Sequence, residues 1–338
     1  MFKKIVSFFV ATLIWGSSTL SVCANTTNNN EVPRCVVDLS NEYDMGDVAI
    51  VRNLYGNDNN VIAYCAEMDN GYFIYDLNGV IVEYCPTGNS PFADVNYETD
   101  VYYACPFGYY VKESNDRYIN VLSDEVMTDE QFDEQLESTC SVSLENKSGI
   151  EAYSSNELKA YDTLLPGSTR LLNYNTMGTC GSMAATIMLC YLYDNVDTAY
   201  LYSYLASNTK TLHDYLVDYI ELEDEDGTRH GSTAESFLGG MRVAWSHLSN
   251  KTVHMNCYKD TSNMWGLAYY EIISAKMPLC MQIDKHPIYG FHWVMVHGTS
   301  QLRDGNTVMK EYYIVNDGWG REGVRILDTY NFSLFYLS

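Results

Sequence analysis

Residues 173–195 contain the clearest candidate nucleophile in this sequence, the cysteine at position 180. The stretch begins with polar residues, reaches a Gly-Thr-Cys-Gly-Ser corner and continues as a run rich in Ala, Met, Ile and Leu. Such a run favours a buried helix, so Cys180 should lie at its first turn. The N–H groups and dipole at a helix start favour the thiolate, which is the nucleophilic form of cysteine. The alternative is an inert buried thiol.

Two candidate partners for this cysteine lie in the last third of the chain. Residues 290–300 and 311–320 are rich in Val, Ile, Tyr and Trp and predict two strands, joined by an Asp-Gly turn at 304–305. Antiparallel pairing of these strands would bring His292 near Asn316. The chain order of the three candidates is therefore Cys, His, Asn.

These motifs resemble the secreted papain-like cysteine peptidases of bacteria, in particular the streptopain-like and bacteriocin-processing-peptidase-like groups. The helix begins Cys-Gly-Ser-Met-Ala-Ala, His292 precedes Gly298 at the spacing of the family's histidine strand, and Asn316 is followed by Gly-Trp-Gly at 318–320. The resemblance covers residues 164–338. It implies a papain-like α+β fold, with a helical half that carries the cysteine and an antiparallel β half that carries the histidine and asparagine.

The resemblance also implies a role for each residue. Cys180 would attack a carbonyl carbon and form an acyl-enzyme, and its backbone N–H would form half of the oxyanion hole. His292 would take the thiol proton and later protonate the leaving amine, while Asn316 would orient the imidazole. Trp319 would shield this pair from water, or would simply belong to the core.

The second donor of the oxyanion hole is a Gln in the family, at a place where this chain has Tyr174. Asn173 and Asn175 are the nearest amides, and we favour Asn175. The base and the orienting group also have alternatives, His297 and Asp317. His297 lies at an odd separation from the preferred histidine, so the two side chains would lie on opposite faces of a regular strand.

The first residues predict export. Lys3 and Lys4 precede an apolar run at 5–15, and small residues follow at 22–24, so residues 1–24 fit a signal peptide. Cys23 also fits a lipoprotein box loosely, which would tether the protein. We therefore expect a secreted or cell-surface protein that does not insert into the membrane after its signal is removed.

Charge and cysteine usage narrow the function further. The formal net charge of −24 argues against nucleic acid and anionic membranes as partners. Ten cysteines are present without a C-x-x-C pair, so we expect no metal site and no cofactor. An exported protein can form disulfides, but their pairing does not follow from the sequence.

Turn-rich segments divide the chain into regions. Residues 25–140 form a β-rich region, 141–160 a polar linker and 161–338 the region of the candidate peptidase domain. Strands of the β-rich region are predicted at 48–54, 61–66, 71–76, 80–84 and 100–104. Residues 71–92 resemble the prodomain of streptopain-like peptidases; an independent accessory domain is the alternative.

Helices are predicted at 209–222, after a cap at 232–235, and at 262–275. His213 is interpreted as a structural histidine of the first of these, and the acidic run at 221–226 as a solvated loop. These features predict a secreted cysteine endopeptidase that acts on proteins or peptides. It would be made as a zymogen, with residues 25–140 as an intramolecular inhibitor and a cleavable linker. An inactive papain-like adhesin or binding module and a cell-wall amidase are the alternatives.

Overall fold

The computed structural model describes most of the chain after residue 31. The described residues are 32–56, 59–103, 107–114, 117–124, 126–128, 130, 132, 158–174, 178–223, 231–259, 263–286, 290–328 and 332–338. The predicted signal peptide, the lipoprotein box at Cys23 and linker residues 141–157 lie outside them, as does Asn175. Among the described residues, no helix is long and apolar enough to cross a bilayer.

The N-terminal region is β-rich, as predicted. Helix α1 (Arg34–Glu42) precedes eight strands: β1 (Val48–Tyr55), β2 (Val61–Met68), β3 (Tyr72–Asp76), β4 (Ile81–Cys85), β5 (Val101–Tyr103), β6 (Tyr109–Ser114), β7 (Arg117–Asn120) and β8 (Val126–Thr128). The five strands predicted from β-branched and aromatic runs overlap β1 to β5. Their antiparallel hairpins are closed by turn-forming residues, as at Leu77-Asn78-Gly79, where the glycine has a left-handed φ of 79°.

The C-terminal region adds seven strands and most of the helices. The strands are β9 (Leu158–Leu164), β10 (Met255–Tyr258), β11 (Leu279–His286), β12 (Gly290–Asp304), β13 (Thr307–Asn316), β14 (Glu322–Leu327) and β15 (Phe332–Leu337). The helices are α3 (Cys180–Asn195), α4 (Ser203–Ala206), α5 (Thr209–Ile220), α6 (Ala234–Leu248) and α7 (Met264–Tyr270), with a short 3₁₀-helix η1 (Thr198–Tyr200) and a short π-helix η2 (Glu271–Ala275). The β12–β13 hairpin and helices α5, α6 and α7 overlap the elements predicted for them.

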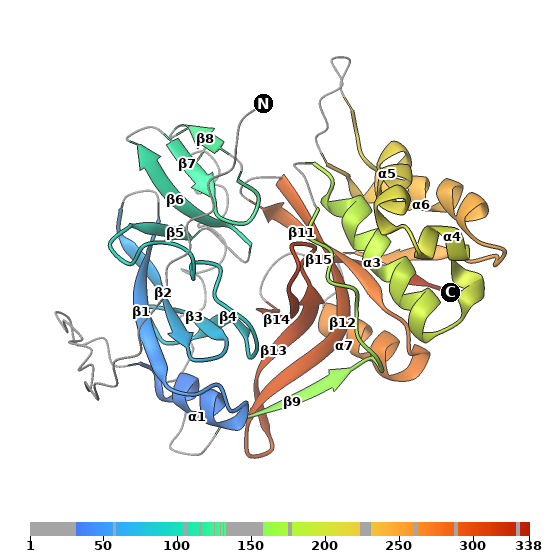
Figure 1. Ribbon diagram of the computed structural model, residues 1–338. Helices are drawn as coiled ribbons and strands as arrows, with labels where there is room; N and C mark the ends of the chain where they lie inside the picture. Colours follow the sequence, from blue (N-terminus) through green and yellow to red (C-terminus); the bar gives the residue numbers. More distant parts are fainter. Residues whose placement is uncertain are drawn as a thin grey trace, which may run out of the picture. The chain divides into compact units, whose positions relative to one another are not determined.

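One continuous sheet joins the two regions (Figure 1). Its strand order is β10-β15-β11-β12-β13-β14-β4-β3-β2-β1-β5-β6-β7-β8, with β9 paired to β12. The junction is the antiparallel pairing of β4 with β14, where Tyr84 lies opposite Arg325 and Glu83 opposite Ile326. The Tyr312 hydroxyl of β13 reinforces it by donating to the carbonyl of Ile81 at 3.0 Å. Residues 32–338 accordingly form one compact unit.

Strand β9 shortens the predicted linker. Leu158 to Ala160, which the prediction placed in the linker, pair with Asp304 to Leu302 of β12. Backbone N–H groups at this end of β9 also donate to side chains of α1, from Ala160 to Glu42 at 2.7 Å. The chain therefore enters the sheet at residue 158, inside the segment that was predicted as linker.

The helices pack on the strands that hold the candidate site. Helix α3 is apolar on all sides and is buried from Cys180 to Leu192, as a core helix should be. The side chain of Thr233 caps α6 by accepting the N–H of Ser236 at 3.1 Å. His213 is buried on α5, and burial lowers its pKa. The architecture is mixed α/β with a large, mostly antiparallel sheet; this layout occurs in many folds, so the papain-like fold stays a prediction.

Candidate active site

Cys180 is the first residue of α3 and is 2% exposed. The backbone of Trp293 on β12 lies close enough to its sulfur to lower the pKa of the thiol. The indole of Trp293 is anchored on the helical side, where its Nε1–H donates to the carbonyl of Ser232 at 2.9 Å. The thiol therefore lies against the peptide that joins His292 to Trp293, which brings the predicted nucleophile to the predicted histidine strand.

Gly181 allows two other segments to reach this helix start. A Cβ at this position would lie 2.1 Å from Ser232 Oγ and 3.3 Å from Glu221 Oε1. A larger residue would force the Ser232 side chain to move. The glycine that follows the cysteine thus lets this side chain pack closely against the helix start.

Glu221 is the site residue that the sequence did not reveal. It is 8% exposed, and its Oε1 accepts the N–H of Ser182 at 2.7 Å and also the Ser182 hydroxyl. A carboxylate at a helix N-terminus is stabilised by the helix dipole. The prediction that residues 221–226 form a solvated loop is therefore wrong for Glu221. The remaining residues of that run with described positions, Leu222 and Glu223, are exposed.

The expectation that the helix start favours a Cys180 thiolate is also wrong for this conformation. Burial raises the pKa of the Cys180 thiol, and the negative charge of Glu221 raises it further. The nearby Trp293 backbone opposes these effects only in part. The N–H of Ser182 at the start of α3 binds the Glu221 carboxylate instead of the sulfur.

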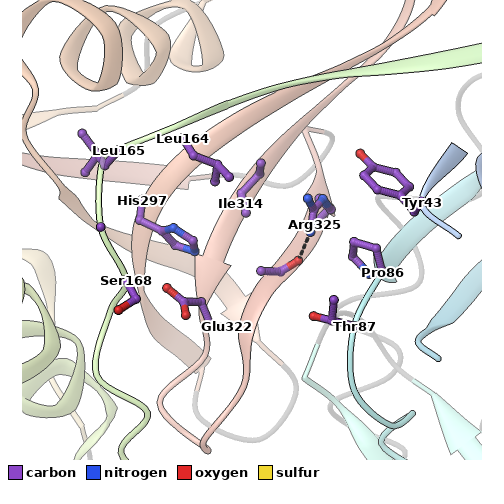
Figure 2. A pocket seen from close by; sticks show the side chains of 12 residues that line it. Tyr43, Pro86, Thr87, Leu164, Leu165, Ser168, His297, Ile314, Glu322 and Arg325 are labelled. Atoms are coloured by element: carbon purple, nitrogen blue, oxygen red, sulfur yellow. Dashed lines mark hydrogen bonds between the residues drawn. The ribbon is translucent and has the colours of Figure 1, made fainter. Parts of the chain in front are cut away.

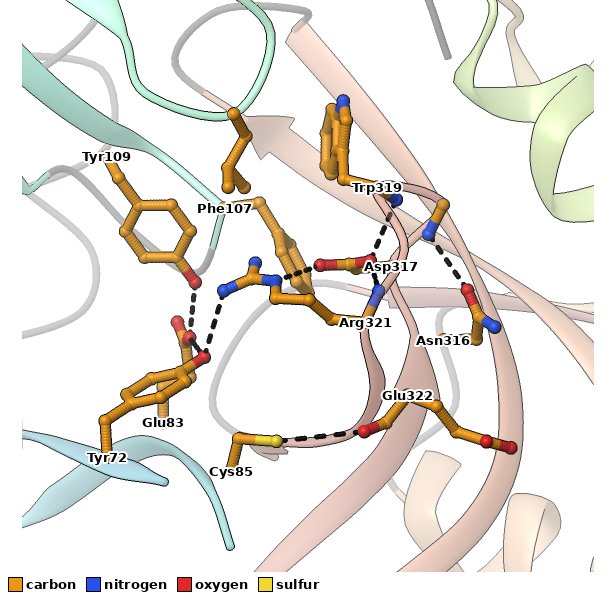
Figure 3. Close-up of polar contacts among 12 residues, drawn as sticks. Tyr72, Glu83, Cys85, Phe107, Tyr109, Asn316, Asp317, Trp319, Arg321 and Glu322 are labelled. Atoms are coloured by element: carbon orange, nitrogen blue, oxygen red, sulfur yellow. Dashed lines mark hydrogen bonds and ion pairs between the residues drawn. The ribbon is translucent and has the colours of Figure 1, made fainter. Parts of the chain in front are cut away.

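His292 lies on β12 opposite Ile283 of β11 and is fully buried. Its imidazole stacks on the indole of Trp319, with ring centroids 4.5 Å apart and planes 9° from parallel. The ring of Phe107, from the N-terminal region, lies 5.1 Å from the imidazole and 6.2 Å from the indole. Figure 3 shows Phe107 and Trp319 beside the turn that follows β13.

Asn316 is the last residue of β13 and pairs with Met295, three residues along β12 from His292. Its Nδ2 donates to Thr169 Oγ1 at 2.7 Å and to the carbonyl of Arg170 at 3.2 Å. Its Oδ1 accepts the N–H of Gly318 at 3.1 Å. Asn316 therefore fastens the segment that leads into α3.

Asp317, the alternative to Asn316, holds the turn that carries Trp319 (Figure 3). Its Oδ1 accepts the N–H groups of Trp319 at 2.9 Å and Arg321 at 3.1 Å. Its Oδ2 pairs with Arg321 Nε at 2.5 Å. The carboxylate is fully buried. Through these bonds it fixes the backbone from which Trp319 reaches His292.

A buried acid from the N-terminal region completes this polar network. Arg321 Nη1 donates to the Tyr72 hydroxyl at 3.3 Å, and Tyr72 donates to Glu83 Oε1 at 2.5 Å. The Tyr109 hydroxyl donates to the same oxygen. Glu83 is fully buried, and the network connects β3, β4 and β6 to the turn beside the candidate histidine.

Glu83 should make the stability of the protein depend on pH. Burial raises its pKa from 4.5 to about 7, while Arg321 and the two tyrosine hydroxyls oppose the shift. Between these pH values the folded state holds a proton that the unfolded chain releases. The free energy of unfolding should therefore fall as the pH rises, by on the order of 3 kcal/mol.

The variant Glu83→Gln tests this expectation, because it keeps an acceptor oxygen for the tyrosines and does not titrate. Its free energy of unfolding should lack the decrease and should exceed that of the native protein above about pH 7. Denaturant unfolding from about pH 4 to about pH 8 measures both curves. Parallel curves would show that the pKa of Glu83 is the same in the folded and unfolded states.

His297 occupies a different environment from His292. It is the extra residue of a bulge in β12, where Val296 pairs with Val315 and Gly298 with Ile314. Its side chain is 5% exposed and lines a cavity (Figure 2) whose lining includes neither Cys180 nor His292. The structure thus places the two histidines in separate sites.

The oxyanion-hole proposal is only partly covered by the described residues. Asn175 lies outside them, Asn173 is exposed, and Tyr174 packs edge-on against the His213 ring. No disulfide joins the described cysteines at 35, 65, 85, 180, 190, 257 and 280. No group of three potential metal ligands occurs among the residues that the structure describes.

No protein-family model matches this sequence, and no related protein is found among curated proteins. The contacts around Cys180 therefore carry the functional proposal.

Proposed function

We propose that this protein is a secreted cysteine endopeptidase in which Cys180 is the nucleophile and His292 the general base. The observation that carries the proposal is the contact between the first residue of α3 and the backbone of Trp293, next to His292. Nucleophilic catalysis by cysteine needs a base near the sulfur and N–H donors at a helix start. The Cys-Gly-Ser, histidine-strand and Gly-Trp-Gly motifs support the same reading.

The chemistry follows from these positions. His292 would take the Cys180 proton as the sulfur attacks the substrate carbonyl, and the backbone N–H of Cys180 would stabilise the oxyanion. The imidazolium would then protonate the leaving amine, and water would release the acyl group from sulfur. Trp319 would fix the orientation of the imidazole through the observed ring stack. Asn316 would act indirectly, through its hydrogen bonds to residues 169 and 170 before α3.

The described conformation fits the latent form of such an enzyme. Cys180 and His292 are both buried, and Phe107 of the N-terminal region covers the histidine. Phe107 adopts a left-handed φ of 73°, which is uncommon for an aromatic residue and has to be compensated by its contacts. We infer that residues 25–140 are an intramolecular inhibitor, and that Phe107 is the residue that blocks His292.

Latency is tested by limited cleavage of the chain that begins at Asn25. The Cys180→Ala protein is treated with a trace of active enzyme, and the products are mapped by mass spectrometry. The prediction placed the cut between Ser141 and Tyr161; because β9 begins at Leu158, we expect it before that residue. Loop segments between ordered elements are the usual sites of such cuts.

Activity of the unmutated protein should rise as this cut accumulates. The uncut Phe107→Ala variant should also gain activity over the uncut native chain, because the cover of His292 is removed. Phe92→Ala is the matched control, since Phe92 is a buried phenylalanine of the same region that packs edge-on against Tyr109. If the uncut native chain is already as active as the cut protein, residues 25–140 are an accessory domain.

The raised pKa of Cys180 favours a second candidate, an inactive binding module that keeps the fold of a peptidase. A buried, protonated thiol is a poor nucleophile. An active-site-directed thiol reagent separates the two candidates when it is applied to the linker-cleaved protein. Labelling at Cys180 supports the peptidase, whereas no labelling after cleavage supports the binding module.

A further inference from the structure

A cavity of about 430 Å³ opens beside β12, β13 and β14 (Figure 2). Its apolar walls are Leu164, Leu165, Ile314 and Pro86, and its polar lining comes from Tyr43, Thr87, Ser168, His297, Glu322 and Arg325. This volume is in the range of small-molecule sites, which are mostly apolar with a few convergent polar groups.

His297 presents a hydrogen-bond acceptor to this cavity. Its ring forms a hydrogen bond with the backbone of Val315, and its Nε2 is buried without a hydrogen-bond partner among the described residues. Nδ1 is therefore the nitrogen bound to Val315. Burial lowers the pKa of His297 to about 4, so the ring is neutral at physiological pH. With its proton on Nδ1, the ring leaves a lone pair on Nε2.

Glu322 supplies a negative charge next to this acceptor. Figure 2 shows its carboxylate beside the imidazole of His297. Its Oε1 accepts the N–H and the hydroxyl of Thr169, both at 2.8 Å. These are neutral donors, so they orient the carboxylate and leave its charge in place.

The positive charge of Arg325, which lines the cavity, is already neutralised by an ion pair with Asp162. Arg325 pairs with Asp162 and donates to the carbonyl of Gly323. The Tyr43 hydroxyl donates to the same aspartate at 3.0 Å. Asp162, which lies outside the lining, neutralises Arg325, so the Glu322 carboxylate is the uncompensated charge at the cavity. An acceptor nitrogen and a carboxylate side by side suit a ligand that is both a cation and a multiple donor.

We propose that this cavity binds a primary ammonium group on a small aliphatic body. The ammonium would donate to His297 Nε2 and pair with the Glu322 carboxylate, while the aliphatic part would pack on Leu164, Leu165 and Ile314. A free amine and the amino terminus of a peptide share this chemistry. The site does not depend on the peptidase proposal, because its lining excludes both candidate catalytic residues.

Nuclear magnetic resonance of the histidine rings tests the proposal. The chain from Asn25, carrying Cys180→Ala and ¹⁵N-labelled histidine, is titrated with pentylammonium, and His297→Phe assigns the His297 signal. A saturable shift of Nε2 is expected, with a dissociation constant no weaker than about 10 mM. Glu322→Gln keeps the acceptor for Thr169 and should weaken binding about tenfold or more, since a hydrogen bond to a charged group is lost.

Glu311→Gln is the matched control, because it removes a carboxylate of β13 that accepts from Gln301 and does not line the cavity. Its affinity should equal that of the parent protein. Leucinamide and pentylammonium distinguish the two sources: tighter binding of leucinamide identifies a peptide amino terminus, and tighter binding of pentylammonium identifies a free amine. The N-acetyl derivative of leucinamide, which lacks the ammonium group, is the negative control. Absence of a saturable shift with either amine overturns the proposal. The proposal is also overturned if 1-pentanol binds as tightly as pentylammonium, or if Glu322→Gln binds pentylammonium with the affinity of the parent protein.

Discussion

Replacing Cys180 with alanine is expected to abolish peptide hydrolysis by the activated protein. Without the sulfur there is no acyl-enzyme, and the remaining oxyanion donor cannot replace a covalent step. The residual activity should be below about a hundredth of the native value, since removal of a nucleophile collapses covalent catalysis. Turnover of a fluorogenic peptide library by the linker-cleaved proteins measures the effect.

The fold should survive this change, because a thiol becomes a methyl group at one buried position. Cys190→Ala is the matched control: Cys190 is fully buried on the same helix and has no proposed chemical role. Its activity should stay close to that of the native protein while both variants keep similar thermal midpoints. Activity above a hundredth of the native value in Cys180→Ala would remove Cys180 from the mechanism.

Replacing His292 with alanine should lower kcat/KM by at least about a hundredfold, because general acid–base catalysis contributes on that scale or more. The sulfur also loses the imidazolium that would stabilise its thiolate. His297→Ala serves as the control and should cost less than about tenfold. The reason is structural: His297 lies in the bulge of β12 and faces the cavity with Glu322, where Cys180 is absent.

The pair of histidine variants also tests the register of β12. If His297→Ala is the more damaging change, the strand must shift on activation so that the bulge moves past Trp293. A loss of activity in both variants with lowered thermal midpoints would point to unfolding, so each measurement includes the midpoint. An intact fold with a large loss in His292→Ala alone is the expected result.

Much of the local structure could be predicted from the sequence. The runs of β-branched and aromatic residues between turn signals indicated β1 to β5 and the β12–β13 hairpin, and the small apolar run after residue 180 indicated α3. These signals are local, because strand propensity and turn chemistry belong to neighbouring residues and an all-apolar run is compatible with a buried helix. The sequence signal for the start of α6, its capping threonine, is equally local.

The relations between segments could not be predicted in the same way. Asn316 follows its strand as expected, but which residue of β12 it faces depends on the register, and a bulge at His297 lies in that pairing. Glu221 looked like part of an acidic loop because its partner, Ser182, is distant in the sequence. The junction of β4 with β14 involves only two residue pairs, which leave no periodic signal.

The β4–β14 junction has a consequence for the cut protein. If the N-terminal region left after cleavage, β14 would become an edge strand whose backbone groups opposite Tyr84 and Glu83 have lost their partners. An open edge of this kind invites pairing with other chains. The ring of Tyr84 also covers Tyr312 from the side, with centroids 5.3 Å apart, so departure would expose aromatic surface as well. A C-terminal fragment made alone should therefore aggregate on a sizing column.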